Sequence, residues 1–495
     1  MSGNLSPNLI QRLSERAITR ADIVKPNRLQ GFSDAVFATA ATLLIIPVRK
    51  FEISKEEALK DALLRHYPQI LVFVLGYMVI CTLWESQLIR YKVLEKVDDV
   101  IVGLTLIHLM FVTFLPFSIS LEGYYNKYET SVFLNASLLL ALEICELVMF
   151  VYGFWNPTLL SERFRQLDAS EKRVKKHQIY TKVIFNCTLF ILAMIFSFAS
   201  FAVAYILICA VIAAPFLKSL MIRCTAFSKQ CGCHDTRSTF EVLTGRIEKE
   251  RLECFTDAAI AIVATLLVLD LTTEEFPKPE DVATKGLLHA LKEMSHFFVS
   301  YIGTYVMVAF LWFIHHSVVQ HIRVFTRSLV AINRTFLAFV AFTPFLSTLT
   351  NEYTGSISSN SQTAVGFSSI VIFFTSFMNV LLIICSLFDP ETTLEEWARP
   401  RDEGNPGLVY LSIKTLIIPV VAFLTFVVSL FGNEASYYAF HISIYLAPVL
   451  LILVKVVYAC HWTHQEHPPN EPSSNYGNEE ITIDEDGGEE RNVII

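Results

Sequence analysis

Two apolar stretches of the chain repeat the same polar side chains at the same spacing. Residues 28–48 read RLQGFSDAVFATAATLLIIPV and residues 251–271 read RLECFTDAAIAIVATLLVLDL, with ten of the 21 aligned positions identical. Each stretch has a hydroxyl–carboxylate pair near its start and a threonine eight positions after the carboxylate: Ser33, Asp34 and Thr42, and Thr256, Asp257 and Thr265. Hydroxyl and carboxylate groups inside apolar helices could either line a pathway through the membrane or form polar contacts that hold helices together. The repetition of the pattern makes these two stretches the first candidates for a functional site.

Helical spacing aligns the middle of each stretch into one stripe. Because positions three and four apart share a helix face, the two stripes contain Ala35, Thr39, Thr42 and Ile46, and Ala258, Ile262, Thr265 and Leu269. One interpretation is that these stripes line a pore, because repeat axes are where transport pathways form. The alternative is packing, since a threonine in a membrane helix often bonds the carbonyl four residues earlier.

The two carboxylates also have two interpretations. Asp34 and Asp257 stand at helix starts, where an acid is favoured by N–H groups that lack a helical partner. Alternatively, they anchor a polar network that fixes the angle of each helix, with Arg28 and Arg251 as members. The alternative role of these arginines is to snorkel to the membrane surface.

Composition places the chain in a membrane. Of its 495 residues 53% are hydrophobic and 17% are charged, and the mean hydropathy is +0.48, whereas soluble domains are about 25% charged. Twelve segments are long and apolar enough for spanning helices, namely 31–48, 69–89, 100–121, 131–155, 180–198, 200–222, 254–271, 296–316, 328–349, 365–388, 408–431 and 436–459. Their continuous apolar runs favour helices over a β-barrel. We expect an all-α polytopic membrane protein.

The repeat divides these segments into two halves of six. A second match lies downstream, where Leu83-Trp84 corresponds to Leu311-Trp312 and Pro116-Phe117 to Pro344-Phe345. We expect Trp84 and Trp312 to support the first helix of each half from outside. Six is an even number, so the halves point the same way and form a parallel repeat.

The distribution of Lys and Arg over the short loops places both termini in the cytosol. The predicted organisation is a cytosolic segment 1–27, a first repeat 28–222, a cytosolic linker 223–250, a second repeat 251–459 and an acidic, disordered cytosolic tail 460–495.

The repeated motif resembles the signature of the transmembrane protein 175 family, the potassium channels of endosomes and lysosomes. It reads Arg-x-x-x-Phe-Ser-Asp at 28–34 and Arg-x-x-x-Phe-Thr-Asp at 251–257, so Phe32 and Phe255 belong to it. The resemblance covers residues 28 to 459. It implies a homodimer whose four signature helices line one central pore, which conducts K⁺ and, from an acidic lumen, H⁺. It implies no cofactor.

The resemblance also assigns layers of the pore. The family's narrowest point is an isoleucine five residues after each signature aspartate, which is Ile262 in the second half but Thr39 in the first. Its threonine layer corresponds to Thr42 and Thr265, and its next aliphatic ring to Ile46 and Leu269. We expect a partly apolar constriction that gates by dewetting, with the threonines favouring K⁺ over Na⁺.

Other polar residues offer further candidates. Glu143 and Glu146 share a helix face within the membrane, where carboxylates are functional by default, although they could also cap a wet groove or pair with Lys182. His315 and His316 end a helix and form either an interfacial polar cluster or a pH sensor. Lys414 and Lys455 read as packing or snorkelling residues.

Two features lie outside the apolar segments. Cys231, Cys233 and His234 lie in the linker and could bind a metal, but three ligands alone are a weak zinc signal. The end of the tail, 490–495, resembles an acidic dileucine sorting signal and agrees with delivery to endosomes and lysosomes.

Several function classes fit the sequence poorly. No basic patch could neutralise nucleic-acid phosphates, and no nucleophile–base pair, metal spacing or phosphate loop supports an enzyme. The alternative to a channel is a secondary K⁺/H⁺ transporter. Transporters tend to break helices at the midplane, and the signature helices carry no Gly or Pro there, so the sequence favours the channel. The membrane lipid is one expected partner; regulatory proteins are not identifiable from these residues.

Overall fold

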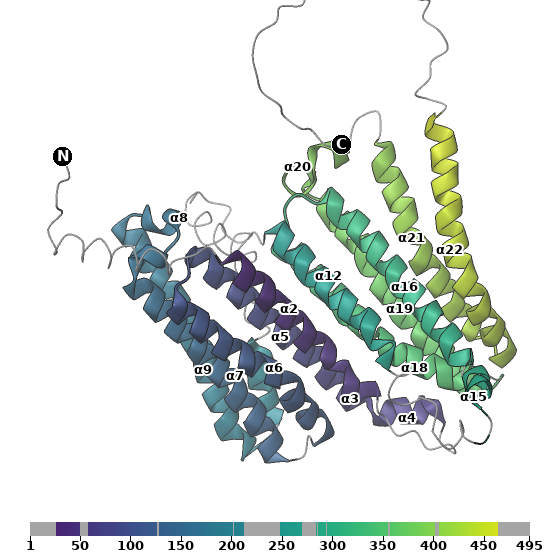
Figure 1. Ribbon diagram of the computed structural model, residues 1–495, viewed down its shortest axis with the longest axis horizontal. Coiled ribbons are helices and arrows are strands. Elements are labelled where there is room, and N and C mark those ends of the chain that lie inside the picture. Colours follow the sequence, from purple (N-terminus) through teal and green to yellow (C-terminus); the bar gives the residue numbers. More distant parts are fainter. Residues whose placement is uncertain are drawn as a thin grey trace, which may run out of the picture.

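The computed structural model describes residues 26–49, 58–125, 128–200, 202–211, 248–269, 284, 286–293, 295–354, 357–400 and 405–463. These residues are almost entirely helical (Figure 1). The first half contains α2 (Asn27–Leu43), α3 (Ile45–Arg49), α4 (Leu59–Arg65), α5 (Tyr67–Val93), α6 (Asp99–Tyr124), α7 (Glu129–Trp155), η1 (Pro157–Leu159), α8 (Glu162–Arg165) and α9 (Ala169–Ser197). A short apolar helix follows at Ala202–Val211.

The second half repeats this order. It contains α12 (Lys249–Leu266), α15 (Leu287–Glu293), α16 (Ser295–His321), α17 (Arg327–Ala341), α18 (Thr343–Tyr353), α19 (Ser359–Leu387), α20 (Pro390–Thr393), η2 (Glu396–Ala398), α21 (Pro406–Ser429) and α22 (Asn433–Thr463). Two isolated antiparallel bridges mark the repeat in space. Leu94 pairs with Leu160 in the first half, and Ile322 pairs with Leu394 in the second. In each half the bridge connects the segment after the second long helix to the segment after the fourth.

Ten helices among the described residues are long and apolar enough to cross a membrane. They correspond to ten of the twelve expected segments, and the all-α polytopic membrane fold is confirmed. The other two segments are 200–222, described as Ala202–Val211, and 254–271, which forms α12 with five charged residues in its first half. The expected boundary between the first repeat and the linker, after residue 222, lies outside the described residues.

Proline positions decide where helices are interrupted. A proline lacks an N–H, and its ring clashes with the carbonyl four residues earlier. Accordingly, α2 ends at Leu43, four residues before Pro47, and α17 ends at Ala341 just ahead of Pro344. The expected segment 328–349 corresponds to the apolar span Arg327–Tyr353, which is interrupted between α17 and α18. The signature helices are nevertheless continuous through their middle, as expected, over Asn27–Leu43 and Lys249–Leu266.

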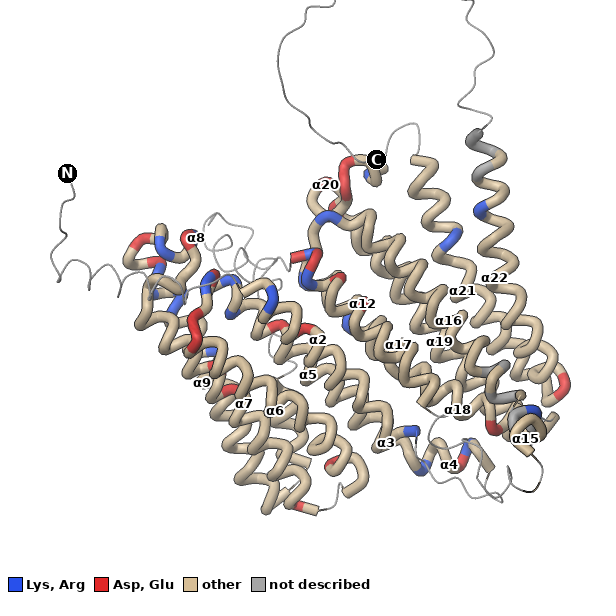
Figure 2. Tube along the Cα trace, viewed as in Figure 1, with Lys and Arg blue, Asp and Glu red and all other residues tan. Residues whose placement is uncertain are grey.

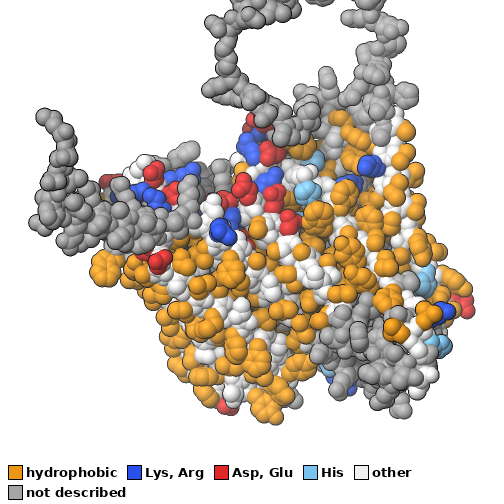
Figure 3. Space-filling model, in the orientation of Figure 1, with side chains coloured by type: hydrophobic (Ala, Val, Ile, Leu, Met, Phe, Trp, Pro, Cys, Tyr) orange, Lys and Arg blue, Asp and Glu red, His pale blue; other side chains and the backbone are white. Residues whose placement is uncertain are grey.

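The signature helices join the two halves. α2 and α12 pack against each other at the centre of the molecule, with α5 and α6 behind α2 and with α16 and α17 behind α12 (Figure 1). Charged residues gather at the end of the bundle where α2 and α12 begin (Figure 2). Below that end the visible surface is mainly hydrophobic (Figure 3), as expected for contact with lipid.

Close helix contact at Gly76 allows a test of this packing. A Cβ atom at Gly76 of α5 would lie 2.7 Å from Cγ2 of Ile119 on α6 and 3.4 Å from Cδ1 of Leu44. We expect Gly76→Ala to lower the free energy of unfolding by about 1–3 kcal/mol, because a well-packed core does not accept extra volume. Thermal unfolding of the purified protein measures the change.

The matched control is Gly103→Ala in α6. No heavy atom of the described residues lies within 4 Å of the position that a Cβ atom would take at Gly103. The change should therefore be neutral or stabilise the helix by up to about 1 kcal/mol. Equal melting temperatures for the two variants would contradict the packing of α5 on α6.

Candidate functional site

The first signature carboxylate is buried between the two halves. Asp34 has an exposed fraction of 0%, and its Oδ1 accepts hydrogen bonds from Trp84 Nε1 at 2.9 Å and from Arg251 Nη2 at 2.7 Å. Trp84 comes from α5 of the same half, whereas Arg251 comes from α12 of the other half. One carboxylate thus ties together the signature helices and their support.

Aromatic stacking reinforces this contact. Phe255 of the second motif lies on the ring of Trp84, with centroids 4.3 Å apart and an interplanar angle of 24°. Both side chains are fully buried. The face of α12 that carries Arg251 and Phe255 therefore covers the face of α2 that carries Asp34. These residues were predicted to form one network, but the sequence did not indicate that the network crosses the repeat.

The second motif has only part of the same arrangement. Trp312 Nε1 donates to Asp257 Oδ1 at 2.8 Å, as Trp84 does to Asp34. Asp257 is exposed, however, and within the described ranges no arginine contacts it. Arg28 is also exposed, and Phe32 is 53% exposed, whereas Phe255 is 0% exposed. The hydrogen bond between Asp257 and Trp312 therefore remains exposed in the single chain.

The hydroxyl next to each carboxylate is buried. Ser33 donates to the carbonyl of Leu29 at 2.8 Å, and Thr256 accepts a hydrogen bond from Asn333 Nδ2 at 3.2 Å. Asn333, on α17, has an exposed fraction of 0%. This residue was not predicted to belong to the site, and its only signal in the sequence is an amide within an apolar segment.

The two threonines of the predicted layer differ in exposure. Thr42 is 1% exposed and donates to the carbonyls of Ala38 and Thr39, both at 3.0 Å. Thr265 is exposed and donates to the carbonyl of Ile262 at 2.8 Å. These backbone bonds are those of the packing interpretation, yet each hydroxyl oxygen keeps lone pairs that can face a cation.

The remaining stripe positions are accessible in both halves. Thr39 is partly exposed and donates to the carbonyl of Ala35 at 2.8 Å. The members of the stripes that are at least partly exposed are Ala35 and Ala258, Thr39 and Ile262, and Ile46 and Leu269. A common open stripe on two packed helices is what an axial pathway requires.

Histidines lie beside the second motif. His316 stacks on Trp312, with ring centroids 5.2 Å apart. His315 is 3% exposed, hydrogen-bonds Asn379 Oδ1 through Nδ1 at 2.8 Å and stacks on Phe336. Both line a small pocket together with Glu253, Thr256, Asp257 and Asn333. His315 is therefore buried within a polar pocket beside the second motif.

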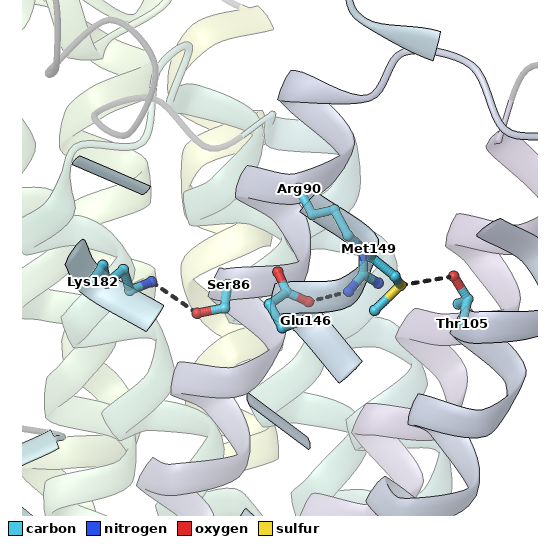
Figure 4. Close-up of polar contacts among 6 residues, drawn as sticks. All are labelled: Ser86, Arg90, Thr105, Glu146, Met149 and Lys182. Atoms are coloured by element: carbon cyan, nitrogen blue, oxygen red, sulfur yellow. Dashed lines mark hydrogen bonds and ion pairs between the residues drawn. The ribbon is translucent and has the colours of Figure 1, made fainter. Parts of the chain in front are cut away.

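The membrane carboxylates have specific partners. Glu146 forms an ion pair with Arg90 of α5, and both side chains are buried (Figure 4). Glu143 accepts a hydrogen bond from Asn186 Nδ2 at 2.9 Å, and Lys182 donates to Ser86 Oγ at 2.8 Å. Lys182 was the partner considered from the sequence. Arg90 was overlooked because it follows an apolar segment and was assigned to a loop.

Some sequence features lie outside the described residues. They include the linker residues Cys231, Cys233 and His234, most of the segment 1–27 and the acidic tail from 464 onward. Among the described residues, no three His, Cys, Asp or Glu side chains form a group that could hold a metal ion.

The repeated helices with their aspartate–tryptophan hydrogen bonds define a two-repeat polytopic membrane protein, and comparison with known proteins identifies its family. The model of the endosomal/lysosomal potassium channel TMEM175 family matches residues 28–116 and 251–344, one match in each half. The endosomal/lysosomal proton channel TMEM175 of Danio rerio is 30% identical over 440 residues, which cover 87% of this chain and 83% of that protein. That of Gallus gallus is 29% identical and covers 87% of this chain and 86% of the relative.

The chain belongs to the TMEM175 family. A crystal structure of a TMEM175 homolog from Chamaesiphon minutus also matches, with 18% sequence identity and a TM-score of 0.34. The match covers 42% of this chain and 97% of that chain. The family is one of ion channels, which is not a class of enzymes.

The Arg90–Glu146 pair provides a stability test. Glu146→Gln leaves a buried guanidinium without its counter-charge, and we expect a loss of about 3–5 kcal/mol in the free energy of unfolding. Replacing both partners, with Arg90→Met and Glu146→Leu, should restore most of that loss, because apolar residues of similar size need no compensation. Thermal or denaturant unfolding of the purified protein distinguishes these outcomes.

The control is Arg165→Gln in α8. Arg165 forms an exposed contact with Glu162 at 3.9 Å, and such surface pairs contribute about 0–1 kcal/mol. A double variant as unstable as Glu146→Gln would show that the pair is not the cause.

Proposed function

We propose that the protein is a potassium-selective, leak-type cation channel of endosomal and lysosomal membranes that also passes protons from an acidic lumen. The observation that carries this proposal is the pair of signature helices, packed on each other with a stripe of small, hydroxyl and aliphatic residues that is at least partly exposed at every position except Thr42. The names of its relatives, as proton channels and as a potassium channel family, support the permeant ions.

The exposure of the two signature helices supports a homodimer. In the single chain, α12 covers the face of α2 that contains Asp34 and Ala38. The equivalent face of α12, with Asp257 and Ala261, is exposed. A second copy of α2 could cover that face as α12 covers α2.

The side chains needed for this contact are present and uncovered. Arg28 and Phe32 of α2 correspond to Arg251 and Phe255 of α12 and are both exposed. Repeating the contact between the halves would place Arg28 of one copy on Asp257 of the other. Phe32 would lie on Trp312, which is 38% exposed. Two copies then give a ring of four signature helices around one axis.

Such a ring gives a pore without a fixed charge at its neck. Thr39 and Ile262 would form the constriction, Thr42 and Thr265 a hydroxyl layer, and Ile46 with Leu269 a second apolar ring. A hydrophobic neck disfavours strongly hydrated ions and can close by dewetting. Since K⁺ sheds water more readily than Na⁺, such a neck with hydroxyl oxygens beside it favours K⁺. No cofactor takes part.

The charges at the end where α2 and α12 begin support an orientation with both termini in the cytosol. Lys and Arg residues gather at that end, around α8 and the start of α12 (Figure 2). The delivery to endosomes and lysosomes is supported by the description of the family.

The deciding experiment is current recording from the expressed protein with K⁺ on one side and Na⁺ on the other, followed by an acidic luminal solution. We expect a current that reverses near the K⁺ potential without a counter-ion and an added acid-dependent component. Flux that occurs only when coupled to an opposing gradient would replace the channel by a transporter.

The threonine layer predicts a loss of selectivity. Thr265→Ala and Thr42→Ala each remove one hydroxyl oxygen per copy, so we expect the K⁺/Na⁺ permeability ratio to fall several-fold. Thr265→Ser keeps the hydroxyl and should retain the ratio. Bi-ionic reversal potentials measure the ratio, and unchanged values in both alanine variants would exclude the threonines from selectivity.

The dimer contact predicts a charge-reversal effect. We expect Arg28→Glu to weaken self-association, because a glutamate would face Asp257 of the second copy. Asp257→Arg in the same chain should restore the dimer with the charges exchanged. Mass measurement of the purified protein in detergent reports the oligomeric state. Arg323→Glu, which alters an exposed arginine of the loop before α17, is the control and should leave the dimer intact.

A further inference from the structure

Two lysines lie within the membrane-spanning part of the second half. Lys414 follows the first residue of α21, Pro406, by eight positions, and Lys455 precedes the last residue of α22, Thr463, by eight positions. At 1.5 Å per residue both are about 12 Å from the helix ends. These ends lie on the side of the bundle where α12 begins (Figure 1).

These two charges lack an acidic partner in the part of the chain that the structure describes. No carboxylate oxygen of those residues lies within 4.0 Å of either ammonium nitrogen. The two lysines lie close together, because Tyr410, four positions before Lys414, stacks on Tyr458, three positions after Lys455, with ring centroids 4.4 Å apart. The membrane lysine of the first half differs, because Lys182 attracts the buried carboxylates of Glu143 and Glu146. An uncompensated pair of cations at membrane depth is costly and calls for an anion.

The conformation of Lys414 argues against snorkelling. A snorkelling lysine extends its stem toward the membrane surface, but Lys414 is only 6% exposed and turns toward α16. Its Nζ donates to Ser317 Oγ at 2.6 Å and lies 3.6 Å from the ring centroid of Phe313. These contacts hold the ammonium group of Lys414 against α16, whereas the side chain of Lys455 is exposed.

The surroundings of the two lysines suit a lipid. Toward the helix ends, the rings of Tyr410 and Tyr458 stack on each other with centroids 4.4 Å apart. The surface beside the lysines is apolar, with exposed residues on both helices: Val409, Ile413, Ile452 and Val456. Figure 3 shows the cationic side chains of this region surrounded by hydrophobic ones. Acyl chains can lie on that surface while a charged headgroup reaches the ammonium groups.

We propose that Lys414 and Lys455 bind the phosphate of an anionic phospholipid, in the leaflet at the end of the bundle where α12 begins. Two ammonium groups offset the charge of a phosphodiester and of a second acidic group in the headgroup. Basic pockets between membrane helices on the cytoplasmic side bind such headgroups. The apolar rim favours a lipid over a free phosphate ion, which would gain nothing from it.

Native mass spectrometry of the purified full chain tests this proposal. The protein is reconstituted in vesicles of phosphatidylcholine alone, or of phosphatidylcholine with phosphatidylserine, and is released with its bound lipids. We expect phosphatidylserine to be retained preferentially. Lys414→Gln and Lys455→Gln should each weaken retention about fivefold, which corresponds to about 1 kcal/mol per lysine.

Lys182→Gln is the matched control, because it removes a membrane lysine that has carboxylates nearby, and retention should be unchanged. Lys455→Gln alters a lipid-exposed side chain, so it keeps the test valid if Lys414→Gln fails to fold. Equal retention in the wild type and in Lys455→Gln overturns the proposal. Displacement of the lipid by inorganic phosphate at equal concentration would also overturn it, in favour of a site for the free ion.

Discussion

The carboxylate of Asp34 is the interaction on which the arrangement of the two halves depends. A charge removed from water costs several kcal/mol unless it is paired and hydrogen-bonded. Its two donors come from α5 and α12, and both approach the same oxygen. The carboxylate is compensated only while α2, α5 and α12 keep their positions, and the stacking of Phe255 on Trp84 excludes water from the contact. The contacts of Asp34 therefore join α2, α5 and α12 at one end of the signature helices.

Duplication of the motif without identical surroundings explains the difference between the halves. Both aspartates accept a hydrogen bond from the tryptophan of their own half, so the local unit is repeated. Only Asp34 is covered, because the chain supplies one α12 to one α2. A single chain contains this contact surface twice, around Asp34 and around Asp257. It can cover only the surface around Asp34 with its own helix, so the two halves differ.

Much of the architecture could be predicted from sequence, because long apolar runs and a repeated motif are strong signals. The membrane helices and the pairing of signature positions with Trp84 and Trp312 follow from them. The partner of Glu146 could not be predicted, since Arg90 stands at a helix end in sequence and becomes buried only when α5 and α7 pack. The interruption between α17 and α18 at Pro344 could not be predicted either, because Pro116 at the matching position lies inside the continuous α6. Whether a proline breaks a membrane helix depends on neighbours that a single sequence does not reveal.

The points at which the signature helices end have an electrostatic consequence. α2 ends at Leu43 and α12 at Leu266, each one residue after the threonine of its half. The C-terminal end of a helix carries a partial negative charge of about half an elementary charge, from carbonyls without helical partners. Both helices therefore direct a partial negative charge toward the level of Thr42 and Thr265. In the proposed pore, these helix ends would favour a cation at that level without an acidic side chain at the neck.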